Sequence, residues 1–254
     1  MAWNPQKYNE FKAERFAPFA DIIKLISKNE KMKVLDLGCG TGELTRKLAD
    51  ELSESTVLGI DSSAEMLDGK DGFSTQHVNF KVENIDTQLN SSEKWDLIFS
   101  HAALQWVDDH ARLFPALLKK LNPGGQIAIQ MPSQNENVLN QLLLKLVQEH
   151  PYAAALKNWK RISPVLTLDD YTRILFEHQA KNLTVFQKVY PIIANNHQDL
   201  YEFISGSALI PYMERLDPGL GEAFITEFKK RIEQHYKKMP AIYAFKRIIL
   251  YAQF

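Results

Sequence analysis

The stretch "VLDLGCGTG", residues 34–42, places a carboxylate, Asp36, two residues before a cluster of glycines at Gly38, Gly40 and Gly42. Glycine-rich turns that follow a strand usually bind a phosphate through backbone N–H groups. A carboxylate at the mouth of such a turn would repel a phosphate, whereas it would attract a cation. The residue types therefore favour a ligand with a positive charge close to the loop. The alternative is a tight turn of structural role only, in which Asp36 caps a helix.

A second acidic residue indicates what else this ligand contains. Asp61, in "GIDSS", ends the next expected strand 19 residues after Gly42 and can accept hydrogen bonds from both hydroxyls of a ribose. S-adenosylmethionine carries both a ribose and an ammonium group, so it suits both acids. Asp61 could instead cap a helix that begins near Ala64, a role that Ser62 or Ser63 could fill equally well.

The adenine of this cofactor would lie against residues at the end of the third expected strand. In "VENID", Asn84 can pair with the adenine edge while Ile85 covers its face, unless the segment is an ordinary polar loop. Met66 can pad the adenosine, although packing in the core suits its residue type better. We predict these cofactor-binding residues: Asp36, Gly38, Cys39, Gly40, Gly42, Asp61, Ser62, Met66, Asn84, Ile85 and Ser100.

Residues after the fourth expected strand, "SHAALQW", are candidates for binding a second ligand, because ligands of open α/β folds bind at the carboxyl edge of the sheet. Gln105 and the indole of Trp106 can donate hydrogen bonds to such a ligand. His101 can do the same as a neutral donor or as a cation, or it can be a polar residue at a strand end. Trp106 fits a packed core position equally well on residue type alone. We predict His101, Gln105 and Trp106 as the catalytic residues.

Other chemistries are disfavoured by composition and spacing. The single cysteine, Cys39, has no recognisable base or metal partner, and the seven histidines lack metal-ligand spacing, so we predict no metal. A formal net charge of -1 gives no general attraction to nucleic acid or anionic membrane. No apolar run approaches the roughly 20 residues of a membrane span. The opening "MAWNPQKYNEFKAERF" lacks the basic and apolar pattern of a secretory signal, so we expect none. We expect a cytoplasmic protein, since one cysteine excludes an internal disulfide framework.

The elements that must position these residues alternate between strand and helix from Met32 to Met131, which predicts an α/β fold with a doubly wound, mostly parallel Rossmann-like sheet. An antiparallel C-terminal strand and helical lid insertions complete it. We expect one domain over 1–254, with a helical lid at 1–30, a cofactor-binding core at 31–132 and acceptor-pocket helices and last strands at 133–254. The expected strands are "KVLDL", "TVLGI", "VNFKV", "WDLIFS", "GQIAIQM", "NLTVFQKVYPII" and "AIYAFKRIILYAQF", and the expected helices include 5–28, Glu43–Leu52, Ala64–Lys70, Asp108–Leu121 and segments within 197–239.

The motifs "VLDLGCGTG", "GIDSS", "WDLIFSHAALQWVDD" and "LLKKLNPGGQIAIQMP" resemble, in order, those of class I S-adenosylmethionine-dependent methyltransferases. The opening "WNPQKYNEFKAER", "LQWVDDHARLFP" and "QMP" are similar to the trans-aconitate methyltransferase family. The "LQW" region also resembles malonyl-acyl-carrier-protein methyltransferases, and the tail resembles juvenile hormone acid methyltransferases. These families all methylate carboxylates. The resemblance therefore implies a carboxyl O-methyltransferase that uses S-adenosylmethionine.

Two positions depart from the trans-aconitate pattern: Ile210 stands where the family usually has arginine, and Asn84 where it commonly has aspartate. We expect a small-molecule carboxylic acid as acceptor, trans-aconitate first, with malonyl-acyl-carrier protein or juvenile-hormone-like acids as alternatives. A non-catalytic S-adenosylmethionine-binding module is the alternative of another class. The N-terminal segment is expected to cover the cofactor through Trp3, Tyr8 and Arg15, unless it is a surface helix. We expect a monomer.

Overall fold

The computed structural model describes residues 12–254, with side chains from Phe16 onward. The chain divides into two compact units, which are described separately. Unit 1 takes in Ser133–Ser163 and Val189–Lys246 together with the start of the first described helix, up to Phe16. Unit 2 takes in Ala17–Pro132, Pro164–Lys188 and Arg247–Phe254. Our expectation of a single domain stays a prediction.

A seven-stranded sheet has the order β3-β2-β1-β4-β5-β7-β6. Strands β1 to β5 pair in parallel, and β7 runs antiparallel to β5, which confirms the expected fold class. The order reverses between β1 and β4, and the carboxyl ends of strands beside such a switch point are where open α/β sheets bind ligands. The strands are β1 (Lys33–Leu37), β2 (Thr56–Asp61), β3 (Val78–Val82), β4 (Trp95–His101), β5 (Leu121–Pro132), β6 (Asn182–Ala194) and β7 (Ala241–Gln253).

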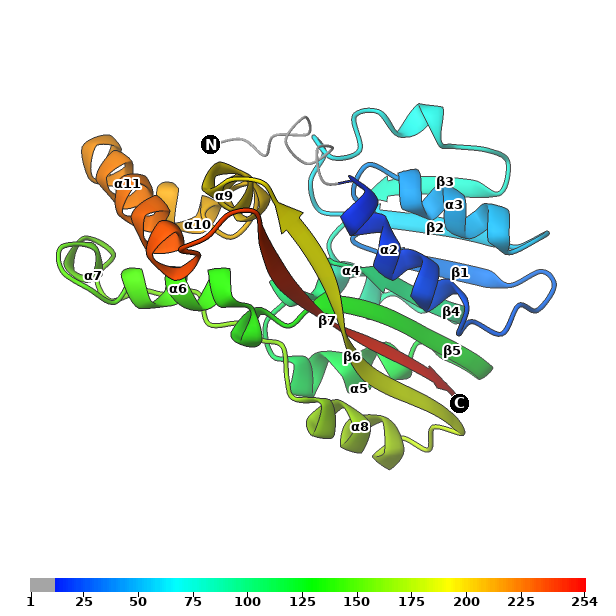
Figure 1. Cartoon of the computed structure of the whole chain (residues 1–254). Helices are drawn as coiled ribbons and strands as arrows, with labels where there is room; N and C mark the ends of the chain where they lie inside the picture. Colours follow the sequence, from blue (N-terminus) through cyan, green and yellow to red (C-terminus); the bar gives the residue numbers. More distant parts are fainter. Residues whose placement is uncertain (1–11) are drawn as a thin grey trace. The chain divides into compact units, whose positions relative to one another are not determined.

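Helices cover both faces of the sheet in unit 2 (Figure 1). On one face lie α2 (Lys12–Ile23) and α3 (Glu43–Glu51), and on the other lie α4 (Ile85–Asn90), α5 (His110–Leu118) and α8 (Leu168–Glu177). The central strands are apolar and buried on both faces, as a parallel sheet between helix layers requires. The helices α4, α5 and α8 contribute to one apolar cluster with β1, β4 and β5.

The helix expected at Ala64–Lys70 is wrong. Residues Ala64–Lys70 form turns that lead into a short 3-10 helix at Lys70–Gly72, because local side chains bind the backbone instead. Asp61 Oδ1 accepts from Ser63 N at 2.9 Å, and Ser63 Oγ accepts from Met66 N at 3.2 Å. Such side-chain contacts compete with helical hydrogen bonds. The short α4 was not expected, since its six residues are too few to show a helical period.

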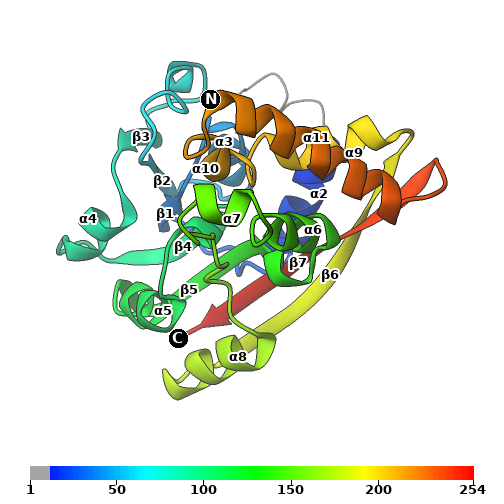
Figure 2. The same cartoon turned by 90° about the vertical axis from the view of Figure 1, so that its left-hand side faces the viewer.

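Unit 1 is mainly helical (Figure 2). It has its own apolar core, in which the helix α11 (Pro218–His235) buries Phe224, Phe228 and Ile232. The expectation of helices within 197–239 is confirmed. The helices of this unit are α6 (Val138–Leu146), α7 (Tyr152–Ala155), α9 (His197–Ser205), α10 (Ile210–Met213) and α11, with 3-10 turns at Gln134–Glu136 in unit 1 and at Leu104–Trp106 in unit 2.

Candidate functional site

The loop between β1 and α3 is held in shape by backbone hydrogen bonds. The N–H groups of Gly38 and Cys39 both donate to the carbonyl of Ile60, at 2.8 and 2.9 Å. Three glycines of the loop have positive φ, 73° at Gly38, 58° at Gly40 and 86° at Gly42. L side chains rarely adopt this conformation, so glycine is required for the shape of the loop.

Gly38 also touches the segment that follows β4. A Cβ atom on Gly38 would lie 2.1 Å from the Cβ of Ala103. Ala103 directly precedes the 3-10 turn Leu104–Trp106, which holds two of the predicted acceptor residues. The contact therefore joins the predicted cofactor loop to the predicted acceptor segment within unit 2.

Asp36 lies beneath this loop, 2% exposed, and accepts a hydrogen bond from Thr45 Oγ1 of α3 at 2.6 Å. It ties β1 to α3 and does not cap the helix, whose N-cap is Gly42. Burial raises the pKa of the Asp36 carboxyl to about 7, against the lowering effect of Thr45, and Asp61 raises it further. No cation of the described residues contributes to this pKa. A cation bound near Asp36 would favour the ionised form, as the predicted ammonium group requires.

Asp61 connects the two loops at the carboxyl ends of β1 and β2. Its Oδ2 accepts from Gly40 N at 2.9 Å and its Oδ1 accepts from Ser63 N. A carboxylate has about four lone-pair positions, so each oxygen keeps capacity for a hydroxyl donor. Ser62 is exposed beside it, and the Met66 methyl group would lie 3.0 Å from a Cβ on Gly40. These positions suit the predicted ribose and adenosine contacts, which stay predictions.

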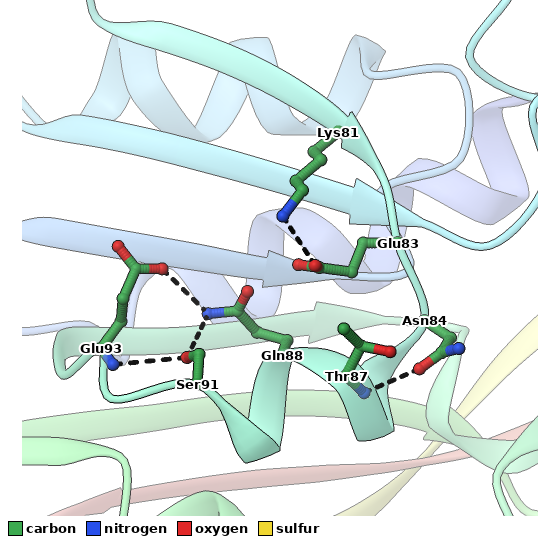
Figure 3. Close-up of polar contacts among 7 residues, drawn as sticks. All are labelled: Lys81, Glu83, Asn84, Thr87, Gln88, Ser91 and Glu93. Carbon is green, nitrogen blue, oxygen red and sulfur yellow. Dashed lines mark hydrogen bonds and ion pairs between the residues drawn. The ribbon is translucent and has the colours of Figure 1, made fainter.

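Asn84 has a structural role of its own (Figure 3). It is the N-cap of α4, and its Oδ1 accepts from Thr87 N at 2.7 Å. Because this oxygen is used by the cap, Asn84 would contact an adenine through its amide nitrogen, as a hydrogen-bond donor. Ile85 packs partly against the apolar cluster of unit 2. The neighbouring Glu83 is ion-paired to Lys81 at 2.7 Å, yet its buried Oε2 has no hydrogen-bond partner.

Two other predicted cofactor residues have their polar atoms directed into the protein. Ser100 is fully buried, and its hydroxyl donates to the carbonyl of Leu37 at 2.8 Å, which ties β4 to β1. Burial, followed by the charges of Asp36 and Asp61, raises the pKa of the Cys39 thiol far above neutrality. Cys39 therefore stays protonated and is no nucleophile, in agreement with its interpretation as a small residue required by the turn.

His101 is neutral at physiological pH. Burial and the charge of Arg247 lower the pKa of its imidazole to about 3. Its Nε2 is buried without a hydrogen-bond partner, and its ring packs edge-on against Phe19 at 6.2 Å between centroids. Of the two charge states that residue type left open, the structure therefore selects the uncharged one.

Gln105 and Trp106 lie in one 3-10 turn but differ in exposure. Gln105 is 4% exposed and its Nε2 donates to the carbonyl of Ala102 at 2.6 Å. Trp106 is 40% exposed, so its packed core interpretation is wrong. The turn begins just after Ala102, whose φ of 56° gives a sharp bend at the end of β4.

His110, which we did not predict, holds this turn in place. Its Nε2 contacts the carbonyl of Leu104 at 2.9 Å, so this nitrogen carries the proton, and its Nδ1 accepts from the hydroxyl of Tyr171. Tyr171 in turn accepts from Leu166 N at 3.1 Å. No local pattern in the sequence indicates this role of His110, because Tyr171 lies 61 residues further along the chain.

Of the three residues predicted to cover the cofactor, Trp3 and Tyr8 lie outside the described residues. Arg15 falls within the described backbone of α2, but its side chain is outside the described set. Among the described residues, no group of three or more His, Cys, Asp or Glu side chains is arranged to hold a metal ion. None of the helices in the described part of the chain has both the length and the apolar character of a membrane span.

Comparisons with known proteins point to one family. A family model described as a methyltransferase domain matches residues 11–185. The chain is 38% identical to trans-aconitate 2-methyltransferase of Deinococcus radiodurans, over 99% of this chain and 98% of the relative. It is 32% identical to the protein of the same name from Variovorax paradoxus, over 100% and 98%. The solved structure of phosphoethanolamine N-methyltransferase 2 of Haemonchus contortus, in complex with S-adenosyl-L-methionine, aligns with a TM-score of 0.55 at 17% identity, over 93% of this chain and 52% of that one.

Proposed function

The chain belongs to the methyltransferase domain family, and we propose on that basis that it transfers the methyl group of S-adenosylmethionine to a carboxylate of a small acid, with trans-aconitate as the first acceptor. The relatives named trans-aconitate 2-methyltransferase match over nearly their whole length, which supports this acceptor. The single cysteine supports the cytoplasm as the place of action.

One observation carries the proposal: the contact between Gly38 and Ala103 joins the loop with the buried acid to the turn that holds Gln105 and Trp106. Asp36 supplies the negative charge for an ammonium group, and Asp61 keeps acceptor capacity for hydroxyls. S-adenosylmethionine, when bound, supplies an electrophilic methyl group on a sulfonium.

No residue needs to remove a proton from the acceptor, since a carboxylic acid with a pKa near 4 is ionised at neutral pH. The tasks left to the protein are to hold a carboxylate oxygen in line with the methyl group and to exclude water, and such positioning is worth roughly 7 to 11 kcal/mol. The indole N–H of Trp106 and the amide of Gln105 are donors for this task. Because His101 is neutral, it would not form an ion pair with the reacting carboxylate, and such an ion pair would make that carboxylate less nucleophilic.

The direct test is incubation with methyl-labelled S-adenosylmethionine and a panel of acids, followed by chromatography of labelled esters. We expect label in trans-aconitate, at a rate above that for malonyl-acyl-carrier protein and for long-chain terpenoid or fatty acids. A faster reaction with one of the latter acids would reassign the acceptor. Absence of any labelled ester, with S-adenosylmethionine still bound in calorimetry, would support the non-catalytic module instead.

A further inference from the structure

Three polar side chains share one face of the sheet at the carboxyl end of β4 and β5. His101 of β4 is the register partner of Gln130 of β5. Arg247 of β7 is the partner of Pro132, two residues beyond Gln130. Register partners and residues two apart point to the same face of a sheet, so His101, Gln130 and Arg247 lie on one face. Phe19 of α2 packs on His101, which identifies it as the face covered by α2.

The contacts within this cluster leave one polar atom of Gln130 and one of His101 without a hydrogen-bond partner. Arg247 Nη1 donates to Gln130 Oε1 at 2.8 Å. This bond fixes the orientation of the Gln130 amide, which is fully buried. The Nε2 atoms of both Gln130 and His101 are buried without a hydrogen-bond partner. A buried polar group left in this way lowers the stability of the protein, so a ligand that accepts from Gln130 would recover that free energy.

Arg247 gives this end of the sheet a fixed positive charge. It is 4% exposed and is the one lysine or arginine among the buried side chains of the described residues. A guanidinium remains charged at all physiological pH values and can bind a carboxylate through two parallel hydrogen bonds. His101 is only partly buried, so the cluster reaches the protein surface at that residue.

The reaction indicates which carboxylate such a cation should bind. The carboxylate that attacks the methyl group loses its charge as the ester forms, so an ion pair to it would stabilise the substrate more than the transition state. A second carboxylate stays ionised throughout and can be held without this penalty. An arginine that binds a non-reacting carboxylate therefore strengthens substrate binding without slowing the methyl transfer.

We propose that Arg247 and the Nε2 of Gln130 bind a non-reacting carboxylate of the acceptor, so that the enzyme selects acids with two or more carboxylates. This inference rests on the proposed function. The two residues are specificity determinants of the acceptor, while Gln105 and Trp106 would hold the carboxylate that reacts.

Steady-state kinetics of Arg247→Gln, Arg247→Lys and Gln130→Met test this inference. For trans-aconitate, we expect Arg247→Gln to raise KM about 10- to 100-fold, with kcat within about threefold and KM for S-adenosylmethionine unchanged. Arg247→Lys keeps the positive charge but loses the two parallel N–H donors of the guanidinium. Its KM for trans-aconitate should lie between those of wild type and Arg247→Gln. The preference for trans-aconitate over a monocarboxylic acid of similar size should fall by the same factor.

Gln126→Met is the matched control. Gln126 is on the same strand and face, is 1% exposed, and makes its hydrogen bonds to Ser27 and Tyr251 instead. Its replacement should lower the melting temperature at least as much as Gln130→Met but leave KM for trans-aconitate unchanged. Equal KM values for wild type and folded Arg247→Gln would overturn the inference and leave the proposed function standing.

Failure of the proposed function is recognised separately, because wild type would then turn over no polycarboxylic acid. In that case, calorimetry with trans-aconitate and S-adenosylhomocysteine measures binding alone. Binding to wild type that weakens at least tenfold in Arg247→Gln would support the anion site. Equal binding to both proteins, or none to wild type, would overturn it.

Discussion

Asp36 lowers stability at neutral pH through its burial, and we predict that it strengthens cofactor binding through its charge. Its carboxyl is buried and has a pKa of about 7, far above its ordinary value of 3.8. Between these two values the folded protein retains a proton that the unfolded chain has lost. The contribution of Asp36 to stability is therefore full below pH 3.8, and it is lost as pH rises toward 7. A bound cation favours the ionised form, so affinity for such a ligand should rise over the same range.

Asp36→Asn should separate these two effects. Asparagine keeps an acceptor for Thr45 and has no charge to bury, so the free energy of unfolding at pH 8 should rise relative to wild type by about 1 to 4 kcal/mol. The difference should shrink toward pH 4. Affinity for S-adenosylhomocysteine should fall at least about tenfold. Urea titrations at pH 5 and pH 8, with calorimetry, measure both quantities, and unchanged affinity would remove Asp36 from the cofactor site.

Gly38 is limited both by its φ of 73° and by its contact with Ala103. We expect Gly38→Ala to lower the free energy of unfolding by about 2 to 6 kcal/mol, from backbone strain and overpacking together. Gly124→Ala is the control, since Gly124 also has positive φ but no atom within 4 Å of an added Cβ. Gly124→Ala should lower the free energy of unfolding through backbone strain alone, by about 1 to 3 kcal/mol.

The contact itself is tested by adding Ala103→Gly to Gly38→Ala. The double variant removes the colliding Cβ atom and should recover part of the lost stability, together with affinity for S-adenosylhomocysteine. Chemical denaturation of all four proteins of this cycle gives the coupling energy. Strictly additive effects would mean that the two residues do not touch.

At the scale of elements, the helix α4 places Asn84 at the end of β3. Asn84→Ala should lower the free energy of unfolding by about 0.5 to 2 kcal/mol through the lost cap, and should weaken S-adenosylhomocysteine binding. Asn84→Asp should keep the cap and tighten binding, because a carboxylate oxygen in place of the amide nitrogen can accept from the adenine amino group. Melting temperature and calorimetry measure the two effects.

Asn196→Ala provides the control for a lost cap. Asn196 caps α9 in unit 1 through a capping box with Asp199. Its replacement should lower stability by a similar amount and leave cofactor affinity unchanged. If Asn84→Ala, Asn84→Asp and Asn196→Ala all bind S-adenosylhomocysteine with the affinity of wild type, the role of Asn84 is limited to capping α4.

The elements also show what local pattern can predict. The strands β1 to β4 were expected to within one residue, because their apolar runs are bounded by polar or glycine residues. The helix expected at Ala64–Lys70 was wrong, since the periodicity of the segment did not reveal that Asp61 and Ser63 bind its backbone. Periodicity describes which face is apolar, whereas these side-chain contacts depend on local geometry.

At the scale of the whole molecule, two apolar cores belong to the two units. Phe228 of α11 is fully buried in the core of unit 1. Phe228→Ala should lower stability by about 3 to 5 kcal/mol. Because the predicted cofactor residues lie in unit 2, the folded variant should keep its affinity for S-adenosylhomocysteine within about twofold in calorimetry. A larger loss in folded protein would show that cofactor binding depends on unit 1.

Phe114→Ala is the matched change in unit 2. Phe114 packs on Tyr171 at 4.8 Å between ring centroids, and Tyr171 binds His110, which holds the turn at Leu104. This variant should lose similar stability and also raise KM for the acceptor. The comparison separates general loss of packing from displacement of the turn.

The sequence by itself determined the parallel sheet and the glycine loop with its acid, because both depend on neighbours within a few residues. It also indicated Gln105 and Trp106 as donors by their place after a strand. Only the tertiary structure decided that His101 is neutral, that Ser100 is directed inward, and that His110 supports the acceptor turn. It alone brought Arg247 beside Gln130, 117 residues earlier in the chain. Burial and charge depend on contacts between distant segments, and those contacts form only when the sheet assembles.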